Sequence, residues 1–147
     1  MDKNQIKNLI IEFMKQMGED ASVEIIESGD FDEIGLSVQD AKMLIGEKGR
    51  NLDALECVLR VFLAGKLKEM YRFTLDVNSY RRQRAGAIKE IAQKTAKKAK
   101  LFQRAITLNP MSASERRVVH MELSTDPDVA TESAGEGEMR RVVVKPR

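Results

Sequence analysis

Residues 45–50 read Ile45-Gly46-Glu47-Lys48-Gly49-Arg50, and this run joins two stretches that both have helical periodicity. Before it, residues 41–45 predict a short helix. After it, apolar residues recur at helical spacing and predict a helix that stops near Gly65. Glycine has no Cβ, so the backbone can turn sharply here and a sugar-phosphate strand can approach it closely. Lys48 and Arg50 add positive charge beside the start of the second helix, where the helix dipole also favours an anion. The same pattern is also typical of a plain corner between two helices.

The elements on either side of this loop give it a context. The apolar spacing of residues 6–17 predicts a helix, and alternation predicts strands at 21–26, 34–38 and 73–77. The resulting order is helix, strand, strand, helix, Gly-x-x-Gly, helix, strand. This order, with the loop at the joint, resembles a KH domain of the bacterial type over about residues 3–78. The resemblance implies that the loop clamps about four nucleotides of a single strand. Glu47 departs from the pattern because it places a negative charge inside the loop.

The second half of the chain predicts a different small domain. Asn78-Ser79 interrupts the pattern, and we expect one domain at 1–78 and another at 79–147. A helix follows to about residue 100, with lysines on one face and an apolar face made by Ile88, Ile91, Ala92, Thr95 and Ala99. We then expect a short strand at 102–108, a helix opened by the capping box Ser112-x-x-Glu115, and a hairpin from 129–133 and 139–145. The predicted fold class is α+β, a KH-like three-stranded sheet with helices followed by a small α/β domain.

Arg116 and His120 lie four residues apart on the capped helix, so they project from one face. Arginine suits phosphate, and histidine can stack on a base or donate to phosphate. A half-buried packing role for a lone histidine is the ordinary alternative. The segments around these residues, 76–81, 109–120 and 136–146, resemble the Arg-x-x-x-His (R-3-H) domains, which bind single-stranded nucleic acid.

The two resemblances together are those of the Jag (KhpB) family of bacteria, also called SpoIIIJ-associated proteins. This resemblance implies a cytoplasmic RNA-binding regulator linked with cell elongation and division, which pairs with a small KH protein. Many members carry an extra N-terminal domain, which we expect this chain to lack.

Charge is distributed unevenly along the 147 residues, although the net charge is only +2. Residues 1–44 carry 4 Lys and Arg against 10 Asp and Glu, whereas residues 45–104 carry 15 against 6. A basic middle segment indicates a polyanionic partner, and a solvated helix face is the alternative.

Several classes of protein are excluded or disfavoured. One cysteine cannot form an internal disulfide, and one histidine with one cysteine leaves too few ligands for zinc, so we expect no metal and no cofactor. The Walker and dinucleotide-binding glycine patterns are absent. Cys57 and His120 are the one nucleophile–base pair to consider, and we interpret Cys57 as a packing residue. We therefore expect no enzymatic activity, and no membrane insertion because no apolar span is long enough.

The sequence thus predicts a binder of single-stranded RNA, with single-stranded DNA as an open alternative, acting as a post-transcriptional regulator or RNA chaperone. The predicted contact residues are Gly46, Glu47, Lys48, Gly49, Arg50, Arg81, Arg84, Arg116, His120, Arg140 and Arg141. Because aromatic residues are few, binding should depend on charge more than on stacking, with Tyr71 and Tyr80 as the exceptions to test. The alternative function is a protein-interaction or dimerisation module, and a reader of duplex DNA is a third class.

Overall fold

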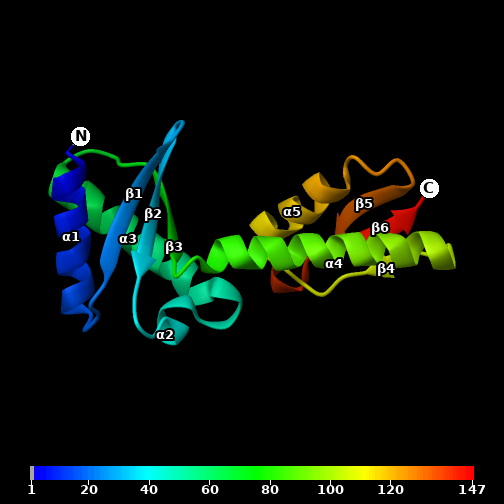
Figure 1. Cartoon of the computed structure of the whole chain (residues 1–147), viewed down its shortest axis with the longest axis horizontal. Helices are drawn as coiled ribbons and strands as arrows, with labels where there is room; N and C mark the ends of the chain where they lie inside the picture. Colours follow the sequence, from blue (N-terminus) through cyan, green and yellow to red (C-terminus); the bar gives the residue numbers. More distant parts are fainter. Residues whose placement is uncertain (1) are drawn as a thin grey trace. The chain divides into compact units, whose positions relative to one another are not determined.

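The computed structural model describes residues 2–147 and divides them into two compact units. Unit 1 ends at Arg81 and unit 2 runs from Arg82 to Arg147. Each unit combines helices with one three-stranded sheet (Figure 1), so the predicted α+β class is confirmed.

Unit 1 contains seven short elements in the expected order. They are α1 (Lys3–Gln16), β1 (Ser22–Ser28), β2 (Phe31–Ser37), α2 (Lys42–Ile45), the 3-10 turn η1 (Glu47–Gly49), α3 (Arg50–Leu67) and β3 (Phe73–Val77). The sheet has the order β1-β2-β3. A tight turn makes β1 and β2 antiparallel, while the crossover through α2 and α3 brings β3 back parallel to β2, with Ile34 beside Leu75.

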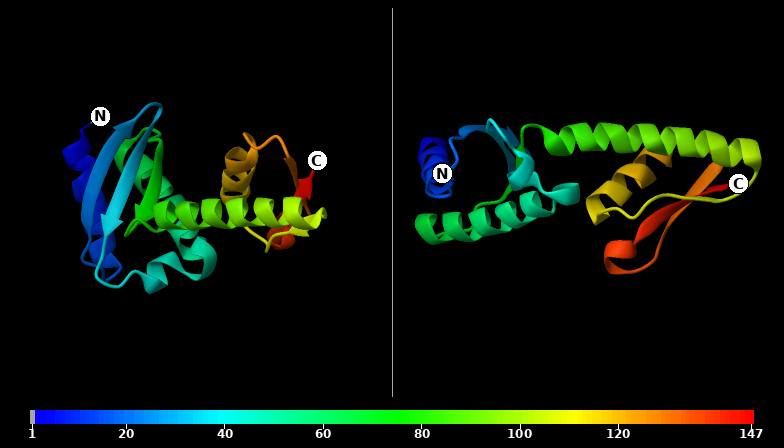
Figure 2. Two further views of the ribbon diagram at one scale, coloured as in Figure 1. Left: turned by 45° about the vertical axis from the view of Figure 1, so that its right-hand side comes forward. Right: turned by 90° about the horizontal axis from the view of Figure 1, so that it is seen from below.

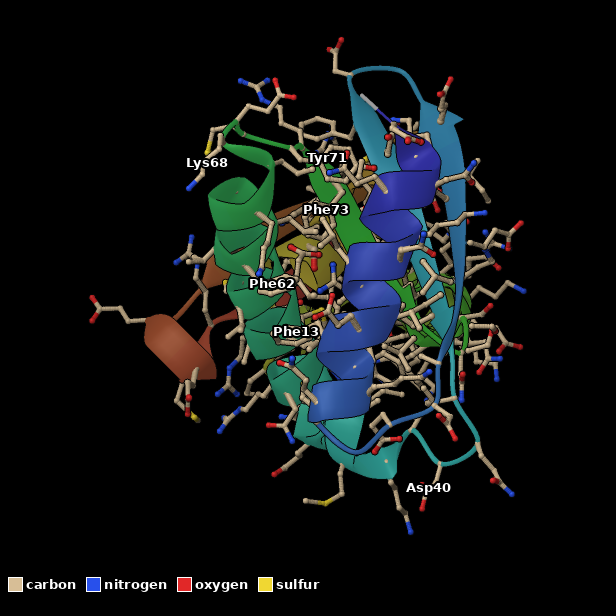
Figure 3. The ribbon with its side chains drawn as sticks, turned by 90° about the vertical axis from the view of Figure 1, so that its left-hand side faces the viewer. Phe13, Asp40, Phe62, Lys68, Tyr71 and Phe73 are labelled. Carbon is tan, nitrogen blue, oxygen red and sulfur yellow. The ribbon has the colours of Figure 1, made fainter. Side chains whose placement is uncertain are left out.

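Helices α1 and α3 lie side by side against the sheet and enclose the core of unit 1 (Figure 3). Their buried residues recur at helical spacing, as the sequence predicted, and the rings of Phe13 and Phe62 meet at 5.0 Å where the two helices touch. The buried helical set is Ile6, Ile10, Met14, Leu52, Leu55, Leu59 and Leu63. Val58 belongs to the apolar pattern that predicts this helix, but it lies outside the buried stripe of α3 and is 52% exposed.

Two carboxylates accept hydrogen bonds from the backbone at the outer edge of β3. Glu56 of α3 accepts a hydrogen bond from the backbone N–H of Leu75 at 2.9 Å, and Asp76 accepts one from the N–H of Val77 at 2.9 Å. Since β2 occupies the other side of β3, these two N–H groups are satisfied without a further strand.

A buried polar cluster ties the start of α1 to the sheet. Asp32 accepts hydrogen bonds from the Lys3 ammonium and, at 2.7 Å, from the Tyr71 hydroxyl. The bond from Lys3, and then that from Tyr71, holds the pKa of Asp32 below its ordinary value of 3.8. Burial, followed by the bond to Asp32, raises the pKa of Tyr71. Tyr71 is only 6% exposed, so it serves the core of unit 1 and offers no surface on which a base could stack.

Unit 2 is built on one long helix. Helix α4 (Tyr80–Phe102) begins in the last two residues of unit 1 and is followed by β4 (Ile106–Thr107), α5 (Ala113–Leu123), β5 (Val129–Ala134), the 3-10 turn η2 (Gly137–Met139) and β6 (Arg141–Pro146). The sheet order is β4-β6-β5 and both pairings are antiparallel. The capping box is confirmed, because Ser112 accepts from the N–H of Glu115 and the Glu115 carboxylate accepts from the N–H of Ser112. The strand expected at 102–108 shrinks to two residues because α4 runs on to Phe102.

Helices α4 and α5 pack side by side and run in the same direction (Figure 2). Three polar contacts connect them and the turn after α5: Arg84 with Glu115, Gln93 with Glu122, and Lys100 with Asp126. The buried stripe of α4 is Ile88, Ala92, Thr95, Ala96 and Ala99, whose mostly small side chains permit close packing. Ile91, expected on this stripe, is 41% exposed because it lies at the edge of the stripe.

Candidate nucleic-acid interface

The loop between α2 and α3 has the strained backbone that glycine permits. Gly46 adopts φ 71° and ψ −179°, and Gly49 adopts the left-handed conformation at φ 78° and ψ 16°. Lys48 between them is also left-handed, at φ 55° and ψ 23°. The N–H of Gly49 donates to the carbonyl of Gly46 at 3.3 Å, which closes the turn.

Asn51, which the sequence analysis did not single out, and Tyr80 hold this turn in place. Asn51 of α3 donates to the carbonyl of Met43 at 2.7 Å, and a Cβ on Gly46 would lie 2.6 Å from the Asn51 Cγ. A Cβ on Gly49 would lie 3.1 Å from the Tyr80 ring. Tyr80 also packs against the core of unit 1, so its role here is to anchor the loop. An asparagine one turn after the first glycine was the available signal for this arrangement.

The loop presents charge to solvent at the start of an 18-residue helix. The side chains of Glu47, Lys48 and Arg50 are exposed. No side chain caps the start of α3, so its positive dipole end and exposed lysine together favour an anion such as a phosphate. Within residues 2–147, no ion pair involves Lys48. Glu47 reduces the local positive charge by one unit.

Arg81 donates hydrogen bonds to three carboxylates of unit 1. Its guanidinium donates to Glu56 at 3.1 Å and to Asp53 at 2.8 Å, and its backbone N–H donates to Asp76 at 2.9 Å. These carboxylates balance its charge and fix the beginning of α4. Arg84 is likewise paired, with Glu115 at 3.0 Å in unit 2.

The Arg-x-x-x-His pair of α5 is half-buried, and both side chains are held by hydrogen bonds. His120 lies with Nδ1 2.7 Å from the hydroxyl of Thr131 and Nε2 2.9 Å from the hydroxyl of Ser133. Arg116 donates to the carbonyl of Met111 at 2.8 Å and so holds the loop before α5. His120 is therefore half-buried, as expected for the packing role that the sequence analysis named as the alternative. Thr131 and Ser133 were missed, although two hydroxyl residues alternating in a strand could have indicated a polar partner on the core side.

Arg140 and Arg141 stabilise the hairpin between β5 and β6. Arg140 donates to the carbonyl of Gly135 at 2.8 Å, and Arg141 donates to that of Met139 at 3.0 Å. An arginine has five N–H donors, so each of these side chains keeps donors for another acceptor.

The largest set of exposed cations lies along α4. Arg82, Lys89, Lys94, Lys97 and Lys98 are exposed, and no ion pair in the part of the chain that the structure describes involves any of them. Lys100 differs, because the carboxylate of Asp126 balances its positive charge. The hydrogen bond between the two side chains raises the pKa of Lys100.

No metal or membrane feature accompanies these groups. The described residues contain no cluster of three His, Cys, Asp or Glu side chains that could hold a metal ion, and none of their helices is both long and apolar enough to cross a bilayer. Cys57 is exposed, so its interpretation as a packing residue was wrong.

Comparison with known proteins agrees with this geometry. Residues 86–146 match the model of the R-3-H domain, so unit 2 is the class of domain that its Arg-x-x-x-His helix indicated. The chain is 32% identical to "RNA-binding protein KhpB" of Clostridium symbiosum, over 97% of this chain and 67% of that protein. It is 34% identical to the protein of that name from Bacillus subtilis strain 168, over 71% of this chain and 51% of the relative, and 28% identical to that from Lactiplantibacillus plantarum, over 92% and 42%. The chain belongs to the Jag (KhpB) family. It spans between 42% and 67% of the length of these relatives.

Proposed function

We propose that this chain is a non-enzymatic protein that binds single-stranded RNA through two modules, a KH-type module in residues 1–78 and an R-3-H domain in residues 79–147. The relatives are named as RNA-binding proteins, which supports RNA as the ligand. The exposed cations of α4 supply the charge that a polyanion requires.

The observation that carries the proposal is the Gly46–Gly49 turn. Asn51 and Tyr80 fill the space beside Gly46 and Gly49 and so fix the turn, which presents the exposed Lys48 at the uncapped start of α3. A phosphate at this point would accept from the lysine and lie at the positive end of the helix dipole. Gly46, Gly49 and Arg50 complete this contact, with Glu47 limiting its strength.

The other predicted arginines contribute through N–H donors that their structural bonds leave unused, and His120 through the face of its ring. Arg116 and His120 are oriented by bonds to Met111, Thr131 and Ser133, so little freedom is lost when they meet a phosphate or base. Arg81, Arg84, Arg140 and Arg141 would add positive charge along the path of the strand, and single-stranded DNA is a weaker ligand of the same surface.

A salt titration tests this proposal. The affinity of the whole chain for a labelled single-stranded RNA would be measured by fluorescence anisotropy at several salt concentrations, beside duplex RNA and single-stranded DNA. We expect preference for the single strand, and a salt slope that Lys48→Gln reduces by about 0.7, the contribution of one phosphate contact. Lys15→Gln, which removes the same charge from the exposed last turn of α1, is the control and should leave the slope unchanged. Equal effects of the two variants, or preference for duplex, would overturn the proposal.

The family resemblance supports a wider role, which we also propose. The chain would act in the cytoplasm as a post-transcriptional regulator or RNA chaperone, in processes linked with cell elongation and division. Crosslinking it to RNA in cells and identifying the bound segments would test this role, and recovery of no RNA above the Lys48→Gln background would contradict it.

A second candidate function rests on an apolar hollow in unit 1. This hollow has a volume of about 300 Å³ and is lined by Phe13, Met17, Met43, Leu44, Asn51, Ala54, Leu55 and Val58. It would receive another KH-type module, from a second copy of the chain or from a small KH protein. Sedimentation of the wild type and of Val58→Asp tests this, with Met70→Asp as the exposed control. A wild type that stays monomeric and does not bind a small KH protein would exclude it.

A further inference from the structure

Unit 2 contains a single Phe, Tyr or Trp side chain, Phe102, and this side chain lies outside its core. The core is entirely aliphatic apart from Met111 and is formed by α4, α5 and the sheet. Phe102 is the last residue of α4 and is 56% exposed. In Figure 2 this end of α4 projects beyond α5. An aromatic ring in this position contributes little to packing within unit 2.

The turn that follows α4 places an arginine beside the ring. Gln103 adopts a positive φ of 53°, and its side-chain amide donates to the carbonyl of Lys100 at 2.6 Å, which ends the helix. The turn brings the guanidinium of Arg104 to 5.6 Å from the centre of the Phe102 ring. A planar cation beside an exposed aromatic ring forms a pair of surfaces on which a third flat group can stack.

The charge around this pair is entirely positive in the local sequence. Residues 91–104 contain five basic residues and no acidic one. Lys98 lies one turn before Phe102 on the same side of α4, and Lys94 and Lys97 continue the stripe toward the N-terminus. Asp126, which lies near the end of α4, is bonded to Lys100. A flat, electron-rich ligand that carries phosphates has the matching chemistry.

We propose that Phe102 and Arg104 form a stacking site for one unpaired base of single-stranded RNA, with Lys94, Lys97 and Lys98 binding the adjoining phosphates. This site rests on the proposed function and adds to it a stacking contact that is absent from the predicted contact residues. Base stacking on an aromatic side chain tolerates any base, so the site would strengthen binding without specifying sequence.

Affinity measurements on the whole chain test the stacking contact. We expect Phe102→Ala to weaken binding of a single-stranded RNA about fivefold or more, with the salt slope unchanged because no phosphate contact is lost. Phe102→Leu keeps an apolar side chain of similar bulk and should lose affinity as well, since it lacks the aromatic face. Phe31→Ala removes a ring of comparable exposure from the first residue of β2 and should have no effect. Full affinity of Phe102→Leu would overturn the stacking site.

The absence of tryptophan provides a direct readout. Phe102→Trp introduces the sole tryptophan of the chain, and we expect RNA to quench its fluorescence while affinity is retained; Phe31→Trp should show no quenching. An RNA of the same length that lacks bases should bind without quenching. If the wild type binds no single-stranded RNA, the proposed function fails. If the wild type binds but Phe102→Ala binds equally well and Phe102→Trp is not quenched, only the stacking site fails.

Discussion

Substitution of Gly46 by alanine tests whether the geometry of the α2–α3 loop is fixed by its neighbours. At φ 71° and ψ −179° a residue with a Cβ is strained by about 1–3 kcal/mol. The new Cβ would also displace Asn51, which costs its hydrogen bond to Met43, about 0.5–1.5 kcal/mol. The lower entropy of the unfolded chain returns about 0.4–1 kcal/mol. We therefore expect the free energy of unfolding of unit 1 to fall by about 0.5–4 kcal/mol.

Hydrogen exchange of the amides in the middle of α3 is the suitable assay, because these amides report the opening of unit 1 alone. Exchange should accelerate about tenfold for each 1.4 kcal/mol lost. Gly29→Ala, at φ 61° with no atom within 4 Å of the new Cβ, should show the backbone strain without the clash. Gly65→Ala, inside α3 with open space and no positive φ, should instead slow exchange, because alanine favours the helix by about 0.5–1 kcal/mol.

The contribution of Asn51 can be isolated with a double variant. Asn51→Ala removes the side chain that the Cβ would meet, so Gly46→Ala should cost less in that background than in the wild type. An equal cost in both backgrounds would refute the clash, and slower exchange in Gly46→Ala would refute the loop geometry altogether.

Three further outcomes follow from the described contacts. Glu56→Gln should lower the urea stability of unit 1 by about 1–3 kcal/mol, since a charged acceptor of the Leu75 N–H is lost. The pKa of Asp32 is depressed in the folded state. The stability that Asp32 contributes is therefore present above its ordinary pKa of 3.8 and is lost as the pH falls through the pKa of the folded state. Asp32→Asn should flatten the decline in urea midpoint between about pH 5 and pH 2. Ser112→Ala should lower the thermal stability of unit 2 by about 1 kcal/mol through loss of the helix cap.

Matched variants provide the controls for these three outcomes. Glu33→Gln, at an exposed position of β2, should leave both the stability and its pH profile close to those of the wild type. An Asp32→Asn profile parallel to the wild type would contradict the Lys3–Asp32–Tyr71 arrangement. Ser114→Ala, inside the first turn of α5, should cost less than Ser112→Ala, and the reverse order would contradict the capping box.

Local patterns predicted most of the elements correctly. The alternation at 73–77 and the capping box at Ser112 each act over a few residues, and the structure contains both. Errors arose where a helical face had to be placed to within a fraction of a turn. Ile91 was expected on the buried stripe of α4, but it lies at the border of that stripe and is exposed.

The side-chain partners of the candidate site could not be predicted because they are distant in sequence. Arg81 meets Glu56 across 25 residues, and His120 meets Ser133 across 13. Periodicity contains no information about such pairs, because they depend on how α3 and β5 are placed by the rest of each unit. The residue types were therefore identified, whereas the fact that most of them are already hydrogen-bonded was not.

The carboxylates bonded to the outer edge of β3 also bear on how the protein behaves at high concentration. A strand with unpaired N–H groups can recruit a strand of another molecule and start aggregation. Here an incoming strand would first have to displace Glu56 from Leu75 and Asp76 from Val77, at the cost of two hydrogen bonds. At the opposite edge, β1 carries Glu24 and Glu27, whose charges repel a second copy of the same strand. Both borders of the sheet thus resist polymerisation, β3 because its outward N–H groups are already bonded and β1 because of its negative charge.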